Sequence, residues 1–203
     1  ALADGIVTST ETSTSYSIVI SPPGSDRRFL HHPGANDDFC ADDVHNEDVQ
    51  DARLFHFGYP PLMARMFADD GSQLTEMFRR VKSLGLTTSL DMAFPDPNSA
   101  AGRSNWRRIL KNTLPHVDIF LPSLDEILFM LGRNVKTPLS AQLLTEVSDE
   151  LLAMGAKMIL LKLGERGLYL RVAPVDVLQN LGRARPIYLP AWANYENWLP
   201  CFQ

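Results

Sequence analysis

Short apolar segments alternate with longer amphipathic segments through most of the chain, and this alternation restricts the fold more than any other feature. Four apolar runs have the length of strands: residues 52–58, 86–91, 117–122 and 157–164. Between them, residues 61–83 and 137–154 carry apolar side chains at helical spacing, and Gly85 and Gly155 end these segments. Wholly apolar strands separated by helices predict a mostly parallel sheet that helices cover on both faces.

Local signals refine this pattern at three places. Asp69, Asp70 and Gly71 predict an interruption in the first long helix. Thr137 and Pro138 predict the start of the second, since threonine is a good N-cap and proline suits the first helical position. Residues 167–172 predict a fifth strand, because they are apolar and follow a glycine-containing turn.

The amino-terminal part of the chain has a different composition and residue pattern. Residues 15–21 and 27–32 are rich in β-branched, aromatic and alternating polar residues, and they flank the sequence Pro-Pro-Gly-Ser-Asp. Proline, glycine and aspartate favour a turn, so these two segments predict a β-hairpin. Its apolar side chains suit a sheet that is buried on one face.

The composition excludes several classes of partner. Nineteen Lys and Arg against 24 Asp and Glu leave a formal net charge of −5, which argues against a broad basic surface for nucleic acid. No apolar run approaches the ~20 residues that cross a bilayer, so no membrane partner is expected. Cys40 and Cys201 have no metal-ligand spacing and favour a reducing, cytoplasmic location.

Ligands of parallel sheets bind at the carboxyl ends of the strands, so the residues just after each strand are the candidates for a site. These are Tyr59, residues 91–96 beginning with Asp91, the tetrapeptide 123–126 and the turn 164–167. No P-loop, GxGxxG or Ser-His-Asp pattern accompanies them, which disfavours P-loop and hydride-transfer chemistry.

The tetrapeptide Ser123-Leu124-Asp125-Glu126 supports two compatible interpretations. It is a capping box, in which Ser123 and Glu126 satisfy the first amides of a helix. A carboxylate in that first turn would also suit magnesium-bound water beside a phosphate. The turn Gly164-Glu165-Arg166-Gly167 is equally ambiguous, since it suits either a hairpin or close approach of a phosphate or ribose.

In order, "PGAND", "ARLFHFGYP", "SLDMAF", "VDIFLPSLDEILFMLG" and "ILLKLGERGLYLR" resemble stretches of the ribokinase-like (PfkB) carbohydrate kinase family, over residues from about 14 to 203. The resemblance implies an α/β fold: a ribokinase-like doubly wound, mostly parallel sheet flanked by helices, with a small β-sheet lid. Residues 1–40 would be the hairpin lid segment, and residues 41–203 an incomplete nucleotide-binding body. The implied activity is transfer of the ATP γ-phosphate, with Mg2+, to a hydroxyl of a sugar or sugar-like molecule.

The same resemblance implies roles on the phosphate side. Glu126 matches the glutamate of the family's Asn-x-x-Glu motif, and Ser123 stands where asparagine is usual; both would organise metal and phosphate. Lys162, Gly164 and Gly167 lie in the stretch that is similar to the nucleotide-side loop.

On the sugar side, Asn36, Tyr59 and Asp91 fall in segments that face the substrate in relatives. The family's catalytic aspartate lies in a Gly-Ala-Gly-Asp turn that does not occur in this sequence, and the glycine-rich sugar-binding segment would precede Ala1. We therefore expect the chain to be a central portion of a kinase, with no catalytic base and poor activity.

Two other functions remain open from the sequence. The chain could be a non-catalytic, kinase-like binding module that forms a homodimer through its hairpin lid, because exposed strand edges invite pairing. It could also be an unrelated α/β hydrolase in which Asp91 and Glu126 bind a metal.

Overall fold

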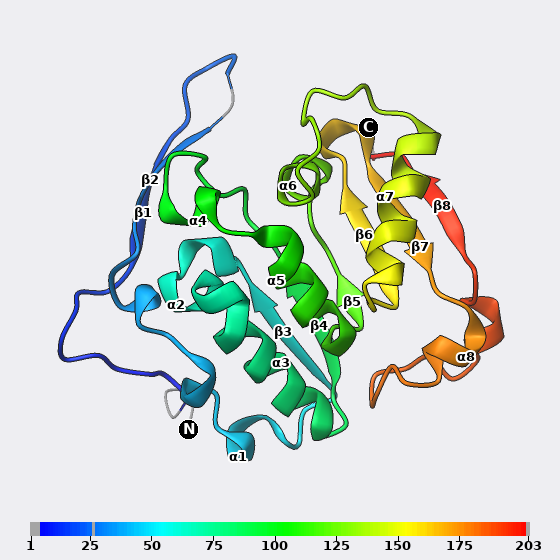
Figure 1. Ribbon diagram of the computed structural model, residues 1–203, viewed down its shortest axis with the longest axis horizontal. Helices are drawn as coiled ribbons and strands as arrows, with labels where there is room; N and C mark the ends of the chain where they lie inside the picture. The colour runs from blue at the N-terminus through cyan, green and yellow to red at the C-terminus, as the bar shows by residue number, and fades with distance from the viewer. Residues whose placement is uncertain (1–4, 26, 202–203) are drawn as a thin grey trace.

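A six-stranded sheet forms the centre of the computed structural model, which describes residues 5–25 and 27–201 (Figure 1). The strand order is β3-β4-β5-β6-β7-β8. The pairs β3–β4, β4–β5 and β5–β6 are parallel, whereas β6–β7 and β7–β8 are antiparallel. The bounds of these strands are Leu54–Gly58, Thr87–Asp91, Ile119–Phe120, Met158–Lys162, Leu168–Val172 and Glu196–Leu199. The predicted mostly parallel sheet is confirmed, and β8 is a strand that the sequence did not predict.

Eight α-helices accompany the sheet within the described residues. They are α1 (Asn46–Val49), α2 (Ala64–Phe67), α3 (Ser72–Ser83), α4 (Ala100–Arg103), α5 (Trp106–Thr113), α6 (Leu124–Met130), α7 (Ala141–Ala153) and α8 (Val175–Leu178). In the part of the chain that is described, no helix is both long enough and apolar enough to span a bilayer.

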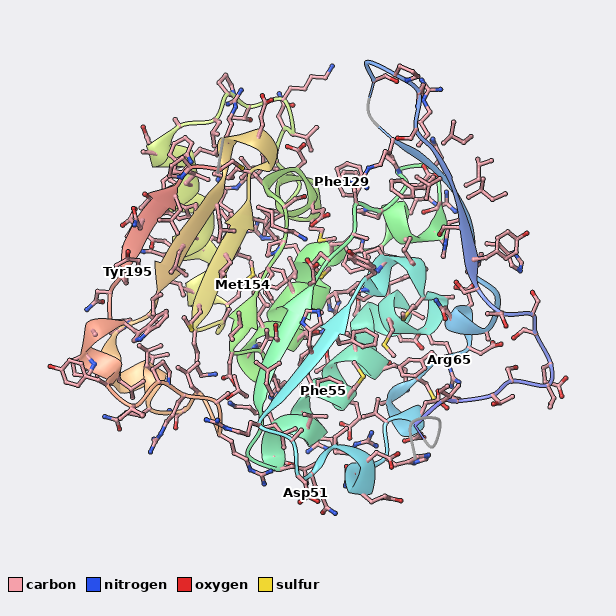
Figure 2. The ribbon with its side chains drawn as sticks, turned by 180° about the vertical axis from the view of Figure 1, so that it is seen from behind. Asp51, Phe55, Arg65, Phe129, Met154 and Tyr195 are labelled. Atoms are coloured by element: carbon pink, nitrogen blue, oxygen red, sulfur yellow. The ribbon has the colours of Figure 1, made fainter. Side chains whose placement is uncertain are left out.

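The helices flank the two faces of the sheet unequally. Figure 1 shows α3, α5 and α7 on the near face, and from behind the strands lie in front of them (Figure 2). On this helical face, Phe55 and Phe57 of β3 pack edge-on against the buried ring of Phe78 in α3. On the opposite face, Leu178 and Leu181 in and after α8 pack with residues at the start of β6 and the end of β7.

The predicted interruption of the first long helix is confirmed. Asp70 has φ 54° and Gly71 has φ 75°, so the chain cannot continue as one helix from α2 into α3. At Gly71 a Cβ atom would lie 2.7 Å from the side chain of Ile109, which leaves room for glycine only.

The predicted start of the next helix is wrong. Thr137 lies in a turn, where its amide and hydroxyl both donate to the carbonyl of Asn134. The helix α7 begins at Ala141 instead, and the Ser140 hydroxyl caps it by accepting from the amide of Leu143 at 3.1 Å. A serine cap bonded to the first turn outweighs the preference of proline for the first helical position.

The hairpin is formed as predicted, but its surroundings are not. Strands β1 (Tyr16–Ile20) and β2 (Arg28–His32) pair antiparallel and stand beside α2 and α4, projecting beyond the six-stranded sheet (Figure 1). The expectation of one buried face is wrong, because apolar side chains on both faces of this ribbon are exposed: Tyr16, Ile18, Val19, Ile20, Phe29 and Leu30. A ribbon of two strands has no second layer to cover it.

A wholly buried carboxylate ties the sheet together at the end where β4, β5 and β6 begin. Asp118 forms ion pairs with Lys82 of α3 at 2.5 Å and with Lys157 at 2.6 Å. It also accepts from the amide of Thr88 in β4 at 2.9 Å. Burial lowers the pKa of Lys82 although Asp118 opposes that shift. One carboxylate therefore links α3 to three neighbouring strands.

Replacing Asp118 with alanine should lower the free energy of unfolding by about 3–5 kcal/mol, because Lys82 and Lys157 would lose the buried carboxylate that pairs with them. Urea denaturation at pH 7 measures this loss. The matched control is Asp149→Ala, since Asp149 pairs with Arg171 at 3.1 Å on the surface and should contribute less than about 1 kcal/mol. Equal losses in the two variants would contradict the central role of Asp118.

Candidate functional site

The candidate site lies at the carboxyl ends of the parallel strands. Asp91 ends β4 and Lys162 ends β6, on either side of β5. Ser123 follows β5 and forms an isolated parallel bridge with Lys162, whose amide donates to the carbonyl of Pro122 at 3.0 Å. The register of three parallel strands thus brings these three residues together, as expected for a sheet of this type.

The tetrapeptide at the start of α6 is a capping box. The amide of Ser123 donates to Glu126 Oε2 at 2.6 Å, and the amide of Glu126 donates to the Ser123 hydroxyl at 3.3 Å. Burial raises the pKa of the Glu126 carboxyl, although the Ser123 amide and the charge of Lys162 oppose the shift. The capping interpretation is confirmed, and it holds a partly buried carboxylate near Lys162.

An ion pair connects two of the predicted site residues. Lys162 Nζ lies 2.6 Å from Asp91 Oδ1, which also accepts from the amide of Met92 at 2.8 Å. The Lys162 side chain is 41% exposed, whereas that of Asp91 is 19% exposed. The lysine therefore crosses the end of β5 to reach a carboxylate that the backbone already holds in place.

A cavity of about 610 Å³ opens beside this ion pair. Its lining combines the start of α6, the end of β6, the following turn and the connection before α7: Ser123, Leu124, Asp125, Val135, Lys136, Thr137, Pro138, Leu139, Lys162, Leu163, Gly164 and Arg166. The lining includes three cationic side chains, Lys136, Lys162 and Arg166, and one carboxylate, Asp125. This excess of positive charge suits an anionic ligand.

The sequence prediction missed the wall formed by residues 135–139. The local signal in this stretch is Thr137-Pro138, which predicts a helix start and not a cavity wall. Turn residues on a connection between two helices do not show which cavity the connection borders, so this wall could not be assigned from the sequence.

The two glycines after β6 have different surroundings. Gly164 has φ 60° and open space around its α-carbon, and it lines the cavity. Gly167 has φ 97°, and a Cβ there would lie 1.9 Å from the carbonyl oxygen of Leu199. Since β6 and β7 pair antiparallel, the hairpin interpretation of this turn is confirmed, and close contact with the end of β8 accounts for Gly167.

The residues predicted for the sugar side divide into two groups. Tyr59 has φ 65°, is 51% exposed and donates its amide to the carbonyl of Asp91 at 3.2 Å. Asn36 lies in the short helix Gly34–Asp37 and borders a separate hollow together with Ile6, Thr12 and Ser15. The structure therefore places Tyr59 next to Asp91 but places Asn36 at the base of the hairpin.

The donor set limits how a metal could bind. Among residues 5–25 and 27–201, no group of three His, Cys, Asp or Glu side chains converges as a metal cluster. Mg2+ commonly keeps several waters and takes one or two carboxylates together with substrate phosphates. Glu126 fits this mode of binding, in which the ion arrives with a phosphate ligand.

Comparison with known proteins identifies one family that matches most of the chain. The model of the family described as pfkB family carbohydrate kinase matches residues 3–179. No curated protein sequence matches the chain.

Three solved structures illustrate the structural similarity. Fructokinase from Xylella fastidiosa has a TM-score of 0.63 and 20% identity, with 83% of this chain and 50% of that chain covered. Ribokinase from Giardia lamblia has a TM-score of 0.60 and 16% identity, with 81% and 46% covered. Arabidopsis thaliana ribokinase complexed with ribose and ATP has a TM-score of 0.56 and 18% identity, with 80% and 46% covered. The chain spans about half the length of these structures, and the similarity confirms the ribokinase-like fold.

The surroundings of Glu126 predict a pH dependence of stability. Because burial raises the pKa of this carboxyl above its ordinary value of 4.5, its contribution to stability is fully present below pH 4.5 and is lost as the pH rises through the folded-state pKa. The free energy of unfolding of the wild type, minus that of Glu126→Gln, should therefore fall as the pH rises from 4 to 7. Denaturant titrations at several pH values measure it, and a constant or rising difference would contradict the assignment.

Proposed function

Since the chain belongs to the pfkB family of carbohydrate kinases, we propose that the protein transfers the γ-phosphate of ATP to a hydroxyl group of a sugar or sugar-like small molecule. The supporting observation is the cavity at the strand ends, where Ser123, Lys162 and Gly164 meet and cationic side chains predominate. ATP as the donor is further supported by the similar ribokinase that is complexed with ribose and ATP.

The phosphate side of the proposed site is the cavity beside β6. Lys162 and Arg166 would contact phosphate oxygens through charge-assisted hydrogen bonds, and the exposed backbone at Gly164 would lie along the nucleotide. Gly167 would keep this turn in shape, because only glycine fits against the carbonyl of Leu199. A bound Mg2+ would neutralise charge on the transferring phosphate. Ser123 would keep Glu126 oriented, and Glu126 would accept hydrogen bonds from water on the ion.

The sugar side of the proposed site starts at Asp91 and Tyr59, which are joined through a backbone hydrogen bond. Their carboxylate and hydroxyl groups suit recognition of sugar hydroxyls. Residues 1–40 would act as the lid over the sugar, with Asn36 at its base, and residues 41–203 would form the nucleotide-binding body. These residues receive binding and positioning roles, and none of them is assigned as the general base.

The proposal predicts ATP-dependent phosphorylation of one or more members of a panel of sugars that includes ribose and fructose by the full-length gene product, and only slow reaction by these 203 residues, in which no general base is assigned. Replacing Glu126 with glutamine should lower turnover by about 10–100-fold, because residues that orient metal-bound water have effects of that size. Detection of the sugar phosphate, together with release of ADP, measures the reaction.

The matched control is Glu146→Gln, which removes an exposed carboxylate on α7 that does not line the cavity. This variant should keep the wild-type rate. Undiminished turnover of Glu126→Gln across a range of magnesium concentrations would remove Glu126 from the mechanism.

The exposed hairpin favours a second candidate function, a kinase-like module that binds a second copy of the chain. Tyr16, Ile18 and Ile20 lie on one face of the ribbon, and Leu30 pairs across from Ile18 on the same face. All four side chains are exposed. Contiguous apolar side chains of this kind mark interaction surfaces.

This second function predicts a dimer in solution that depends on one face of the hairpin. The double substitution Ile18→Ser and Leu30→Ser should shift the protein from dimer to monomer in analytical ultracentrifugation. The corresponding change on the other face, Val19→Ser with Phe29→Ser, is the matched control and should leave the dimer intact. A wild-type protein that is monomeric at high concentration would exclude this function.

A further inference from the structure

Lys162 takes part in two structural features that the proposed function treats separately. Its side chain lines the cavity assigned to the nucleotide. Its ammonium group, however, is bonded at 2.6 Å to Asp91, which is assigned to the sugar. The same lysine therefore connects the two halves of the site across the end of β5.

The ion pair is built so that one partner is fixed and the other can move. The amide of Met92 holds Asp91 Oδ1 at 2.8 Å, and the Asp91 side chain is mostly buried. Lys162 carries its charge on a flexible four-carbon stem and is 41% exposed, so its ammonium can turn into the cavity without losing solvation.

A polyphosphate in the cavity would compete with Asp91 for this ammonium. Such a ligand carries several negative charges, and Lys136 and Arg166 line the same space and would attract it as well. One carboxylate with a single charge is the weaker partner once several phosphate oxygens are within reach.

We infer that Lys162 is an electrostatic latch, whose ammonium leaves the Asp91 carboxylate for the phosphates of the incoming nucleotide and thereby frees Asp91 to accept a hydrogen bond from the sugar. This inference rests on the proposed function and adds to it a regulatory coupling between the two ligand sites. Because such coupling is reciprocal, the sugar and the nucleotide strengthen each other's binding. Lys162 is thus a positioning residue for Asp91 as well as a ligand of phosphate.

A thermodynamic cycle on the 203-residue chain tests the latch, with sodium tripolyphosphate and ATP as the probes in titration calorimetry. Asp91→Asn should tighten the binding of both probes about threefold to fivefold, because a half-exposed ion pair no longer has to be broken. Lys162→Met should weaken binding about tenfold, through loss of a charge-assisted hydrogen bond. The double variant should bind as Lys162→Met does, since Asp91 acts only through Lys162.

Asp125→Asn is the matched control for net charge, because Asp125 lines the cavity directly. It should tighten binding by the same factor whether residue 162 is lysine or methionine. If Asp91→Asn also tightens binding equally in both backgrounds, its effect is general electrostatics and the latch is overturned.

A spectroscopic readout separates movement of the lysine from a static role. The carboxyl carbon resonance of Asp91 should shift when tripolyphosphate is added to the wild type, and should not shift on the same addition to Lys162→Met. Suppose that the probes bind, that the Asp91 resonance does not shift when tripolyphosphate is added, and that Asp91→Asn does not change the affinity. The latch then fails and the proposed function stands. If neither probe binds to the wild type, both are overturned.

Discussion

The buried carboxylate of Asp118 is the interaction on which the arrangement of the sheet depends. It must be paired, because an isolated charge away from water is highly unfavourable, and Lys82 and Lys157 provide the pairing from α3 and from the residue before β6. Satisfying one ion therefore sets the positions of α3, β4, β5 and β6 relative to one another. With the beginnings of the strands held together, their carboxyl ends are held in register as well.

That register creates the candidate site at the opposite end of the sheet. Asp91 and Lys162 end strands that are separated by β5, and they form an ion pair only because β4, β5 and β6 are parallel and aligned. The capping box at Ser123 and Glu126 also shapes this site, since the bond that starts α6 orients a partly buried carboxylate near Lys162. Under the proposed function, the residues that stabilise the start of α6 would also serve ligand binding.

The six-stranded body and the hairpin differ in how far their apolar side chains are buried. In the body, the aromatic residues of β3 are covered by Phe78 of α3. In the hairpin, side chains such as Ile18 and Leu30 remain exposed, because a two-stranded ribbon has no layer of its own to pack against. The proposed functions would cover these side chains with a sugar ligand or with a second copy of the chain.

Much of the fold follows from the sequence, because the local pattern of apolar residues predicts the strands β3, β4 and β6 and the helices α3 and α7. Gly85 and Gly155 mark the ends of the two helices. The capping box is equally local, as it involves only Ser123 and Glu126. Other features could not be predicted. The pairing of β8 and the wall at residues 135–139 depend on which segments become neighbours after folding, whereas the start of α7 at Ala141 depends on which of two local candidates, Thr137 or Ser140, caps the helix.

The sequence by itself therefore determined the order and type of most elements and named the residues at the ends of the strands, since these depend on short-range spacing. Only the tertiary structure decided that Lys162 pairs with Asp91, that Gly167 serves the contact with Leu199, and that Asn36 lies apart from the cavity. The physical reason is that side chains interact when they are close in space, whatever their separation in the sequence. Lys162 and Asp91 come within 2.6 Å only after β4, β5 and β6 have assembled side by side.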